Sequence, residues 1–225
     1  MPAELLSEFI SGGAKKPNIA ALSGPSFAAD VARGLPTAVT VASDSITVSN
    51  LLASQLSSSR FRCYASSDLK GVELGGALKN VIAIAVGAVR GMGLGASAEA
   101  ALIARGFAEM TRIATGLGAQ AATLTGLSGL GDLVLTCSHT QSRNFAYGMA
   151  LGRREPLDGR PLAEGAFTAA IAAKIAKSRN IDAPITVAVA QVLEQEITPQ
   201  AAVSQLLERP IKSELEPNSN RGAGK

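Results

Sequence analysis

The sequence is poor in the residues that most often build stacking surfaces and metal sites. Its 225 residues include no tryptophan, two tyrosines, six phenylalanines, two cysteines and one histidine. So few aromatic rings argue against a stacking platform for single-stranded nucleic acid, and one histidine without a Cys-x-x-Cys pair argues against structural zinc. We therefore expect Cys63 and Cys137 to be buried thiols in a reducing cytoplasm, and His139 to be a surface residue.

Long hydrophobic runs and a strong excess of charge are also missing. The longest apolar run, Val81–Val89, has nine residues, whereas a bilayer span needs about 20. The segment MPAELLSEFI lacks the basic and apolar regions of a signal peptide. The net charge is only +3, from 21 basic and 18 acidic residues. So weak a positive excess does not indicate a nucleic-acid-binding surface. These features predict a cytoplasmic protein with neither a membrane span nor a nucleic-acid partner.

The composition is that of a folded, helix-rich protein. Hydrophobic residues make up 47% of the chain and charged residues 17%, and glycine occurs 23 times. This balance is globular rather than disordered, and the length suffices for one large domain or two modest ones. Abundant small residues allow helices to pack closely.

The first part of the chain alternates between strand and helix patterns. Short, partly β-branched runs predict strands over Asn18–Leu22, Thr37–Ala42 and Phe61–Ala65. Helices are expected between them, over Ser26–Arg33 and Ser45–Leu56. This rhythm indicates the end of a sheet with helices packed on it, and three strands alone leave an edge uncovered.

Beyond Ser67 nearly every segment has a helical pattern. The expected helices are Asp68–Val89, Ser97–Gly116, Ser142–Leu151, Leu162–Ser178, Ile185–Gln195 and Pro199–Leu207. In Ser97–Gly116 an apolar stripe at helical spacing predicts a buried face, while Arg105, Glu109 and Arg112 are expected on the opposite face. The polar tail over residues 212–225 is expected to be disordered.

One charged residue interrupts the apolar helix in the run GGALKNVIAIAVG. Lys79 and Asn80 follow three small residues that let a ligand or another backbone approach closely. A lysine in such surroundings is readily shifted in pKa and suits proton transfer. Two structural alternatives stay open, namely a lysine that extends to solvent at the helix edge and a simple ion pair with Glu73.

Three further polar segments stand beside apolar runs. Asp132, in GLSGLGDLVLT, is either a buried partner for a cation or the N-cap of a short helix. The segment Ser142-Arg143-Asn144 combines a helix start with a guanidinium, which suits a phosphate or carboxylate but also a solvated helix end. The turn around Gly24 and Ser26 is either a second anion cradle or an ordinary strand-to-helix turn. Together these groups suit a small phosphorylated substrate with a carbonyl to protonate.

The order and spacing of several motifs resemble a known family. LSGPSFA, GVELGGALKNVIAIAVG, TGLSGLGDLVLTC, QSRNFAYG and AEG occur in the order found in bacterial NAD(P)-dependent sn-glycerol-3-phosphate dehydrogenases. The resemblance spans roughly Leu22–Leu207, and GALKN and GLGDLVLTC followed by SRN are its most specific parts.

The resemblance implies a mostly α fold. An all-helical C-terminal domain, like that of 6-phosphogluconate dehydrogenase, would follow the last βα units of a Rossmann sheet. The implied division is a remnant of the NAD(P)-binding domain over residues 1–67, a helical substrate-binding domain over 68–211 and a tail over 212–225. The implied activity interconverts sn-glycerol 3-phosphate and dihydroxyacetone phosphate with NAD or NADP, in the biosynthesis of glycerophospholipids.

The family's functional residues map onto matching positions of this sequence. Lys79 corresponds to the proton donor and acceptor. The implied substrate-binding residues are Gly24, Ser26, Lys79, Asn80, Asp132, Ser142, Arg143 and Asn144. The implied cofactor-binding residues are Ala28, Arg143, Leu162 and Glu164. No metal is implied, and the resemblance leaves a homodimer open.

The sequence departs from the family in its dinucleotide site. The family's G-x-G-x-x-G unit is absent, and the GMGLG at Gly91–Gly95 follows a helix instead of a strand. The family's upstream substrate-binding lysine is also absent. We therefore expect an N-terminally truncated relative that binds NAD(P)(H) weakly and is inactive alone. Two rival interpretations are a related dehydrogenase of the hydroxyacid or 6-phosphogluconate type and a non-catalytic helical dimerisation fragment.

Overall fold

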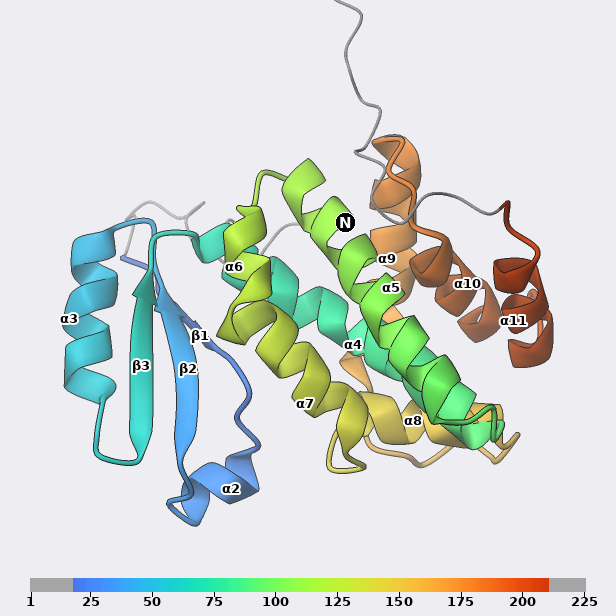
Figure 1. Ribbon diagram of the computed structural model, residues 1–225, viewed down its shortest axis with the longest axis horizontal. Helices are drawn as coiled ribbons and strands as arrows, with labels where there is room; N and C mark the ends of the chain where they lie inside the picture. The colour runs from blue at the N-terminus through green and yellow to red at the C-terminus, as the bar shows by residue number, and fades with distance from the viewer. Residues whose placement is uncertain (1–17, 211–225) are drawn as a thin grey trace, which may run out of the picture.

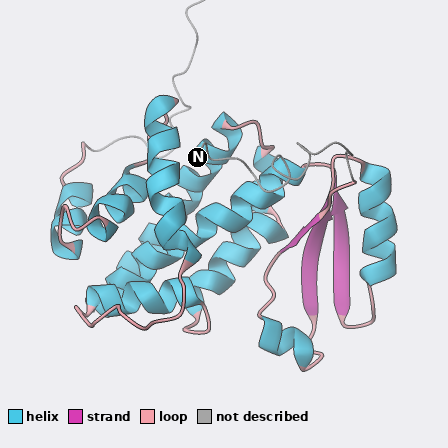
Figure 2. Cartoon of the chain, turned by 180° about the vertical axis from the view of Figure 1, so that it is seen from behind, coloured by secondary structure: helices cyan, strands magenta, loops and turns pink. Residues whose placement is uncertain are grey.

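The computed structural model describes residues 18–210 and places a small sheet beside a bundle of helices (Figure 1). The sheet region consists of β1 (Ala21–Ser23), α2 (Ala28–Ala32), β2 (Thr37–Ala42), α3 (Ile46–Leu56) and β3 (Phe61–Ser66). Seen from behind, the strands lie between α3 on one side and the bundle on the other (Figure 2).

The three strands form one sheet in the order β1-β2-β3. β1 pairs antiparallel with β2, and β2 pairs parallel with β3, where Val39 lies opposite Cys63. Helix α3 packs on β2 and β3, and Val39, Val41, Ala53 and Cys63 form the small core beneath it. The β-branched run of β2 is a strand, as its pattern predicts, and the pairing of the sheet places it in the centre.

The helical bundle follows directly after β3. It consists of α4 (Leu69–Gly91), α5 (Ala96–Gly116), α6 (Ala121–Thr125), the π-helical turn η1 (Leu127–Gly131), α7 (Asp132–Ser138), α8 (Arg143–Gly152), α9 (Glu164–Ser178), α10 (Pro184–Leu193) and α11 (Pro199–Leu207). Helix α4 is central and contacts α5, α7, α8, α9 and α10. Its apolar residues form the main core of the protein.

Helix α4 begins at a shared cap. The carboxylate of Asp68 accepts from the Gly71 N–H of α4 and from the Gln120 N–H before α6, each at 2.9 Å. Of the helices in residues 18–210, α4 alone has the length and hydropathy to cross a membrane, but 67% of its most apolar stretch is buried in the bundle. Its hydrophobicity is therefore accounted for by its position in the core.

Glycines allow α4 and α8 to cross at backbone contact. A Cβ on Gly148 of α8 would lie 2.1 Å from the Ile84 carbonyl oxygen, and one on Gly87 of α4 would lie 2.2 Å from that of Phe145. Neither distance is compatible with a side chain. This close crossing places the first residues of α8 beside the middle of α4.

Most sequence-based elements are confirmed, with their ends shifted by at most three residues. The strand expected over Asn18–Leu22 occupies Ala21–Ser23, and the helix expected over Ser26–Arg33 is the shorter Ala28–Ala32. Helix α9 begins at Glu164 instead of Leu162. Both cysteines are free and buried, and His139 is exposed as expected. The expected polar tail and residues 1–17 lie outside the described part of the chain.

One expectation about an acidic residue is wrong, and for a second acidic residue one of two alternatives is confirmed. Glu109, expected on a solvent-facing side of its helix, is fully buried because it accepts hydrogen bonds from the start of α10. Asp132 does not cap a helix, because it lies within the helical turns where η1 runs into α7 and its carboxylate bonds to other side chains.

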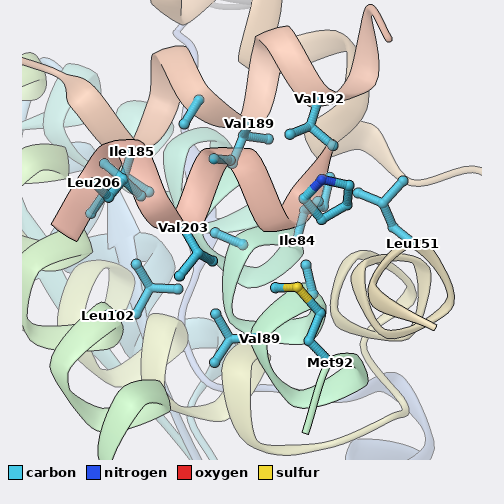
Figure 3. A pocket seen from close by; sticks show the side chains of 15 residues that line it. Ile84, Val89, Met92, Leu102, Leu151, Ile185, Val189, Val192, Val203 and Leu206 are labelled. Carbon is cyan, nitrogen blue, oxygen red and sulfur yellow. The ribbon is translucent and has the colours of Figure 1, made fainter. Parts of the chain in front are cut away.

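A small, partly open apolar pocket lies in the helical bundle (Figure 3). It has a volume of about 50 Å³ and lies among residues of α4, α5, α8, α10 and α11, such as Ile84, Leu102, Leu151, Val189 and Leu206. Every side chain that lines it is apolar, so it offers no group for binding charge or moving a proton. The chemistry must be sought elsewhere.

Candidate active site

A polar cleft of about 460 Å³ lies where the loop after β1 meets α4, α7, α8 and the start of α9. Nine of the residues singled out by sequence line it, namely Gly24, Ser26, Lys79, Asn80, Asp132, Ser142, Arg143, Asn144 and Glu164. The structure thus brings together positions from across the chain. Ala28 and Leu162 are exposed and are absent from the lining of this cleft.

Lys79 and Asp132 form an ion pair inside the cleft. The Lys79 Nζ donates to Asp132 Oδ2, across 53 sequence positions and from α4 to α7. The side chain of Lys79 is 18% exposed and that of Asp132 only 5%. The ammonium group therefore has a carboxylate partner on its buried side and remains reachable from the cleft, which answers the question raised by its apolar helix.

The carboxylate of Asp132 is held by more than the lysine. Thr136, one turn further along α7, donates its hydroxyl to Asp132 Oδ1 at 3.3 Å. Burial raises the pKa of Asp132, while the charge and hydrogen bond of Lys79, the Thr136 hydroxyl and the Gly24 backbone N–H all favour the ionised form. The carboxylate is thus desolvated but well supplied with donors, and this fixes the position of the Lys79 ammonium group.

The segment Ser142-Arg143-Asn144 forms the start of α8 on the other side of the cleft. Ser142 is the N-cap, and its hydroxyl oxygen accepts from the Phe145 N–H at 3.2 Å. Asn144 is buried, whereas the side chain of Arg143 is 54% exposed. A buried cap therefore places an exposed guanidinium and a buried amide at the cleft.

Asn144 also fixes the start of α9. Its Oδ1 accepts from the Gly165 N–H at 2.8 Å, which supplies the side-chain cap that Ala163 cannot provide. The same amide donates from Nδ2 to Glu164 Oε2 at 3.4 Å, and Arg143 pairs with Glu164 Oε1. Arg143, Asn144 and Glu164 therefore form one cluster at the mouth of the cleft.

The turn after β1 closes the cleft from the sheet side. Gly24 has a φ of +149°, and a Cβ there would lie 2.9 Å from the Cα of Val39, so a side chain is excluded at this position. The Ser26 hydroxyl donates to the Gly24 carbonyl oxygen at 3.0 Å. This tight turn brings the Gly24 N–H toward Asp132.

Cys137 is buried near the site, and its thiol is expected to be unreactive. It is 1% exposed, and burial raises the pKa of its thiol to about 12 although the charge of Lys79 opposes the shift. A thiol with such a pKa is protonated at neutral pH, and only the thiolate is a good nucleophile. The cleft therefore offers acid–base chemistry through Lys79 and no thiol nucleophile at this position.

Seven further lining residues were not among the predicted site residues, namely Leu22, Ser23, Phe27, Gly76, Leu135, Thr136 and Gln141. Thr136 bonds to Asp132, and its position four residues later on the same helix was a usable signal. Gln141 precedes the cap of α8 in a polar loop, where no pattern distinguishes a lining residue from a solvated one.

The arrangement combines two functions in one cleft. A lysine held by a buried carboxylate can give or take a proton, and a guanidinium, an amide and a helix N-terminus can hold an anion beside it. Together with the fold, this defines the class of protein as a helical bundle beside a small sheet, with a polar cleft suited to acid–base chemistry and anion binding.

Comparison with known families identifies the family. Residues 68–204 match the model for the NAD-dependent glycerol-3-phosphate dehydrogenase C-terminus, and residues 2–49 match that for the N-terminus of the same family. The chain therefore belongs to the NAD-dependent glycerol-3-phosphate dehydrogenase family, as its motifs imply.

Individual relatives agree with this assignment. The chain is 59% identical over 210 residues to a glycerol-3-phosphate dehydrogenase [NAD(P)+] of Brucella ovis, covering 93% of this chain. A Chelativorans protein of the same name is also 59% identical, over 211 residues. The crystal structure of glycerol-3-phosphate dehydrogenase from Coxiella burnetii is 42% identical with a TM-score of 0.86, covering 91% of this chain and 65% of that one.

A more distant structure shows the shared fold alone. Glycerol-3-phosphate dehydrogenase from Plasmodium falciparum is 19% identical, with a TM-score of 0.83 over 93% of this chain and 62% of that one. The chain spans 64% of the length of the Brucella ovis and Chelativorans relatives. Activity and substrate therefore enter below as proposals.

Proposed function

We propose that this chain carries the substrate half of an oxidoreductase that interconverts sn-glycerol 3-phosphate and dihydroxyacetone phosphate with NAD(P)(H). The observation that carries the proposal is the Lys79–Asp132 pair, which lies in the same cleft as Arg143 and Asn144. A proton donor and an anion-binding group in one polar cleft suit a short substrate that carries both a carbonyl and a phosphate.

Lys79 is the proposed proton donor and acceptor. Reduction of a ketone places negative charge on its oxygen, and a positioned ammonium group can neutralise that charge and supply the proton. Asp132 and Thr136 hold the ammonium group in one place, so no reorganisation is required when the charge develops. In the reverse direction neutral Lys79 would take the proton of the alcohol.

The phosphate is proposed to lie at the start of α8. Arg143 offers a planar pair of N–H donors, Asn144 an amide, and the first turn of α8 its free backbone N–H groups. These groups would fix the distance from the phosphate to the reacting carbon. Asn80, whose amide donates to the Gly76 carbonyl oxygen at 3.2 Å, lines the cleft beside Lys79 and would contact the middle of the substrate.

The residues of this chain could contact only part of a bound dinucleotide. When bound, a nicotinamide dinucleotide supplies or accepts the hydride. Arg143 and Glu164 lie at the mouth of the cleft and would contact it there. The glycine-rich strand-to-helix turn that binds a pyrophosphate is absent from the 225 residues. We therefore expect weak binding of NAD(P)(H) to this chain by itself.

Several broader features belong to the same proposal. Residues 1–67 would be part of the dinucleotide-binding domain, and residues 68–211 the substrate-binding domain. The protein would be cytoplasmic, would serve glycerophospholipid synthesis, and would form homodimers. The rival interpretation as a hydroxyacid dehydrogenase is disfavoured by the family match.

A chimera provides the test. The part of the Brucella ovis relative outside the 210 aligned residues is joined to the chain, and NADH oxidation with dihydroxyacetone phosphate is followed. Lys79→Ala should lower kcat/KM by about 10²–10⁴-fold. The control is Lys174→Ala, which removes an exposed lysine remote from the cleft. An active chimera in which Lys79→Ala loses less than about tenfold would refute the proposed role.

A further inference from the structure

The charged residues of the cleft form two ion pairs of different character. Its charged lining residues within the described chain are Lys79, Asp132, Arg143 and Glu164, so their formal charges cancel. Each of these cations pairs with its own carboxylate. A phosphate that enters the cleft must therefore compete with a carboxylate already present.

The two pairs differ in how firmly they are held. The side chains of Lys79 and Asp132 are 18% and 5% exposed, and Asp132 has further donors in Thr136 and Gly24. The side chains of Arg143 and Glu164 are 54% and 44% exposed. An exposed pair contributes only about 0.2–1 kcal/mol. The Arg143–Glu164 pair can therefore exchange, whereas the Lys79–Asp132 pair is fixed.

The carboxylate of Glu164 occupies the groups that would hold a phosphate. One of its oxygens pairs with the Arg143 guanidinium, and the other accepts from Asn144 Nδ2 at 3.4 Å. A phosphate bound by the same two side chains would place its oxygens at these donors. The carboxylate and the phosphate therefore cannot both make these contacts.

The backbone of Glu164 is anchored independently of its carboxylate. Asn144 Oδ1 accepts from the Gly165 N–H at 2.8 Å, and the start of α9 lies against α4, where a Cβ on Gly165 would be 2.5 Å from the Asn80 carbonyl oxygen. The Glu164 side chain can thus rotate away from Arg143 while α9 stays in place.

We propose that Glu164 is an internal place-holder for the substrate phosphate. In the ligand-free protein its carboxylate orients Arg143 and Asn144, and the incoming phosphate displaces it. The inference rests on the proposed function for its ligand. A phosphate, with a charge of about −1.5 to −2, outcompetes this carboxylate more readily than a singly charged carboxylate ligand does. Glu164 thus contributes to selection of phosphorylated substrates over carboxylates of the same length.

The test is a titration of this chain with inorganic phosphate and with sn-glycerol 3-phosphate at low ionic strength. Binding is followed by ¹⁵N NMR through the backbone amides of the first turn of α8. Glu164→Gln should lower the Kd for both ligands about two- to fivefold, which corresponds to the loss of one exposed ion pair. This gain in affinity should disappear when Glu164→Gln is made in the Arg143→Gln background, because the two side chains act on the same ligand.

A charge-matched control separates local competition from net charge. Glu155→Gln removes the same charge from an exposed pair with Arg160, outside the cleft, and should leave both Kd values unchanged. An equal gain in Glu155→Gln, or an unchanged or higher Kd in Glu164→Gln, would overturn the proposal. A larger gain in affinity for ADP than for sn-glycerol 3-phosphate would also overturn the proposal, since Glu164 would then compete with a phosphate of the cofactor.

The outcomes also distinguish the place-holder from the proposed function. If the chimera needs Lys79 and phosphate binding needs Arg143, but Glu164→Gln brings no gain, only the place-holder fails. If phosphate binding does not depend on Arg143, the place-holder and the proposed phosphate site fail together.

Discussion

The substitution Glu109→Gln changes a single buried charge that connects two helices. Glu109 of α5 is 0% exposed, and its two carboxylate oxygens accept from the Thr186 N–H at 2.6 Å and the Ile185 N–H at 2.8 Å. These donors belong to the first turn of α10, whose N-cap residue Ala183 makes no side-chain cap. Glu109 thus supplies the cap that the sequence of α10 lacks.

The expected loss of stability follows from the number of hydrogen-bond acceptors that the substituted side chain offers. Glutamine keeps one acceptor oxygen and sets an NH₂ group against the second backbone N–H. One unsatisfied buried donor costs about 1–3 kcal/mol. Loss of negative charge at a helix N-terminus adds up to about 2 kcal/mol, and relief from burying a charge acts in the opposite direction. We expect the free energy of unfolding to fall by about 1–3 kcal/mol.

The contribution of Glu109 to the free energy of unfolding should depend on pH in a definite direction. Burial raises the pKa of Glu109, against the opposing effects of Thr186, Ile185 and Arg112. Above the usual pKa of 4.5 the folded protein therefore retains this proton more strongly than the unfolded chain does. The contribution of Glu109 to the free energy of unfolding then falls as pH rises through the raised pKa. Glu109→Gln lacks this group, so its loss of stability relative to the wild type should become smaller as pH rises above 4.5.

Urea unfolding at several pH values, followed by circular dichroism, measures both effects. The control is Glu196→Gln, which removes an exposed carboxylate and should change the free energy of unfolding by less than about 0.5 kcal/mol. The reasoning is refuted if Glu109→Gln behaves like this control, or if its deficit grows with rising pH.

Two further predictions concern close packing and the buried thiol. Gly148→Ala should destabilise the protein by about 1–3 kcal/mol or more, because its Cβ would lie 2.1 Å from a backbone oxygen of α4. Gly131→Ala, where the nearest atom is 3.6 Å away, is the helical control, and equal unfolding midpoints would contradict the packing argument. In a Cys63→Ser background, Cys137 should resist an aromatic disulfide reagent at about pH 8 until urea unfolds the protein, since its pKa is about 12. Rapid labelling of the folded state would show that the thiol is accessible.

Local pattern was sufficient for most elements of the fold. Strand β2 could be read from its β-branched alternation, and α10 and α11 from a proline at the first helical position. Ser142 could be read as an N-cap because the cap is a local interaction, between residues three positions apart. The motifs also identified the family, which the comparisons confirm.

The position of a residue within the bundle could not be predicted from the local sequence pattern. The spacing of Glu109 on α5 fits a solvent-facing ion-pair row, yet the residue is buried because its partners come from α10, 76 and 77 positions later. The π-helical turn η1 and the antiparallel pairing of β1 also went unpredicted, since both depend on contacts made elsewhere in the chain.

For the cleft, the sequence by itself determined which residue types were present: one lysine in an apolar helix, one acid after a glycine, and one arginine at a helix start. Only the tertiary structure decided that Lys79 pairs with Asp132 instead of Glu73 or solvent, and that Glu164 pairs with Arg143. The physical reason is that burial and charge pairing depend on distances between helices. Those distances are set by the glycine-mediated crossing of α4 and α8, which no local window contains.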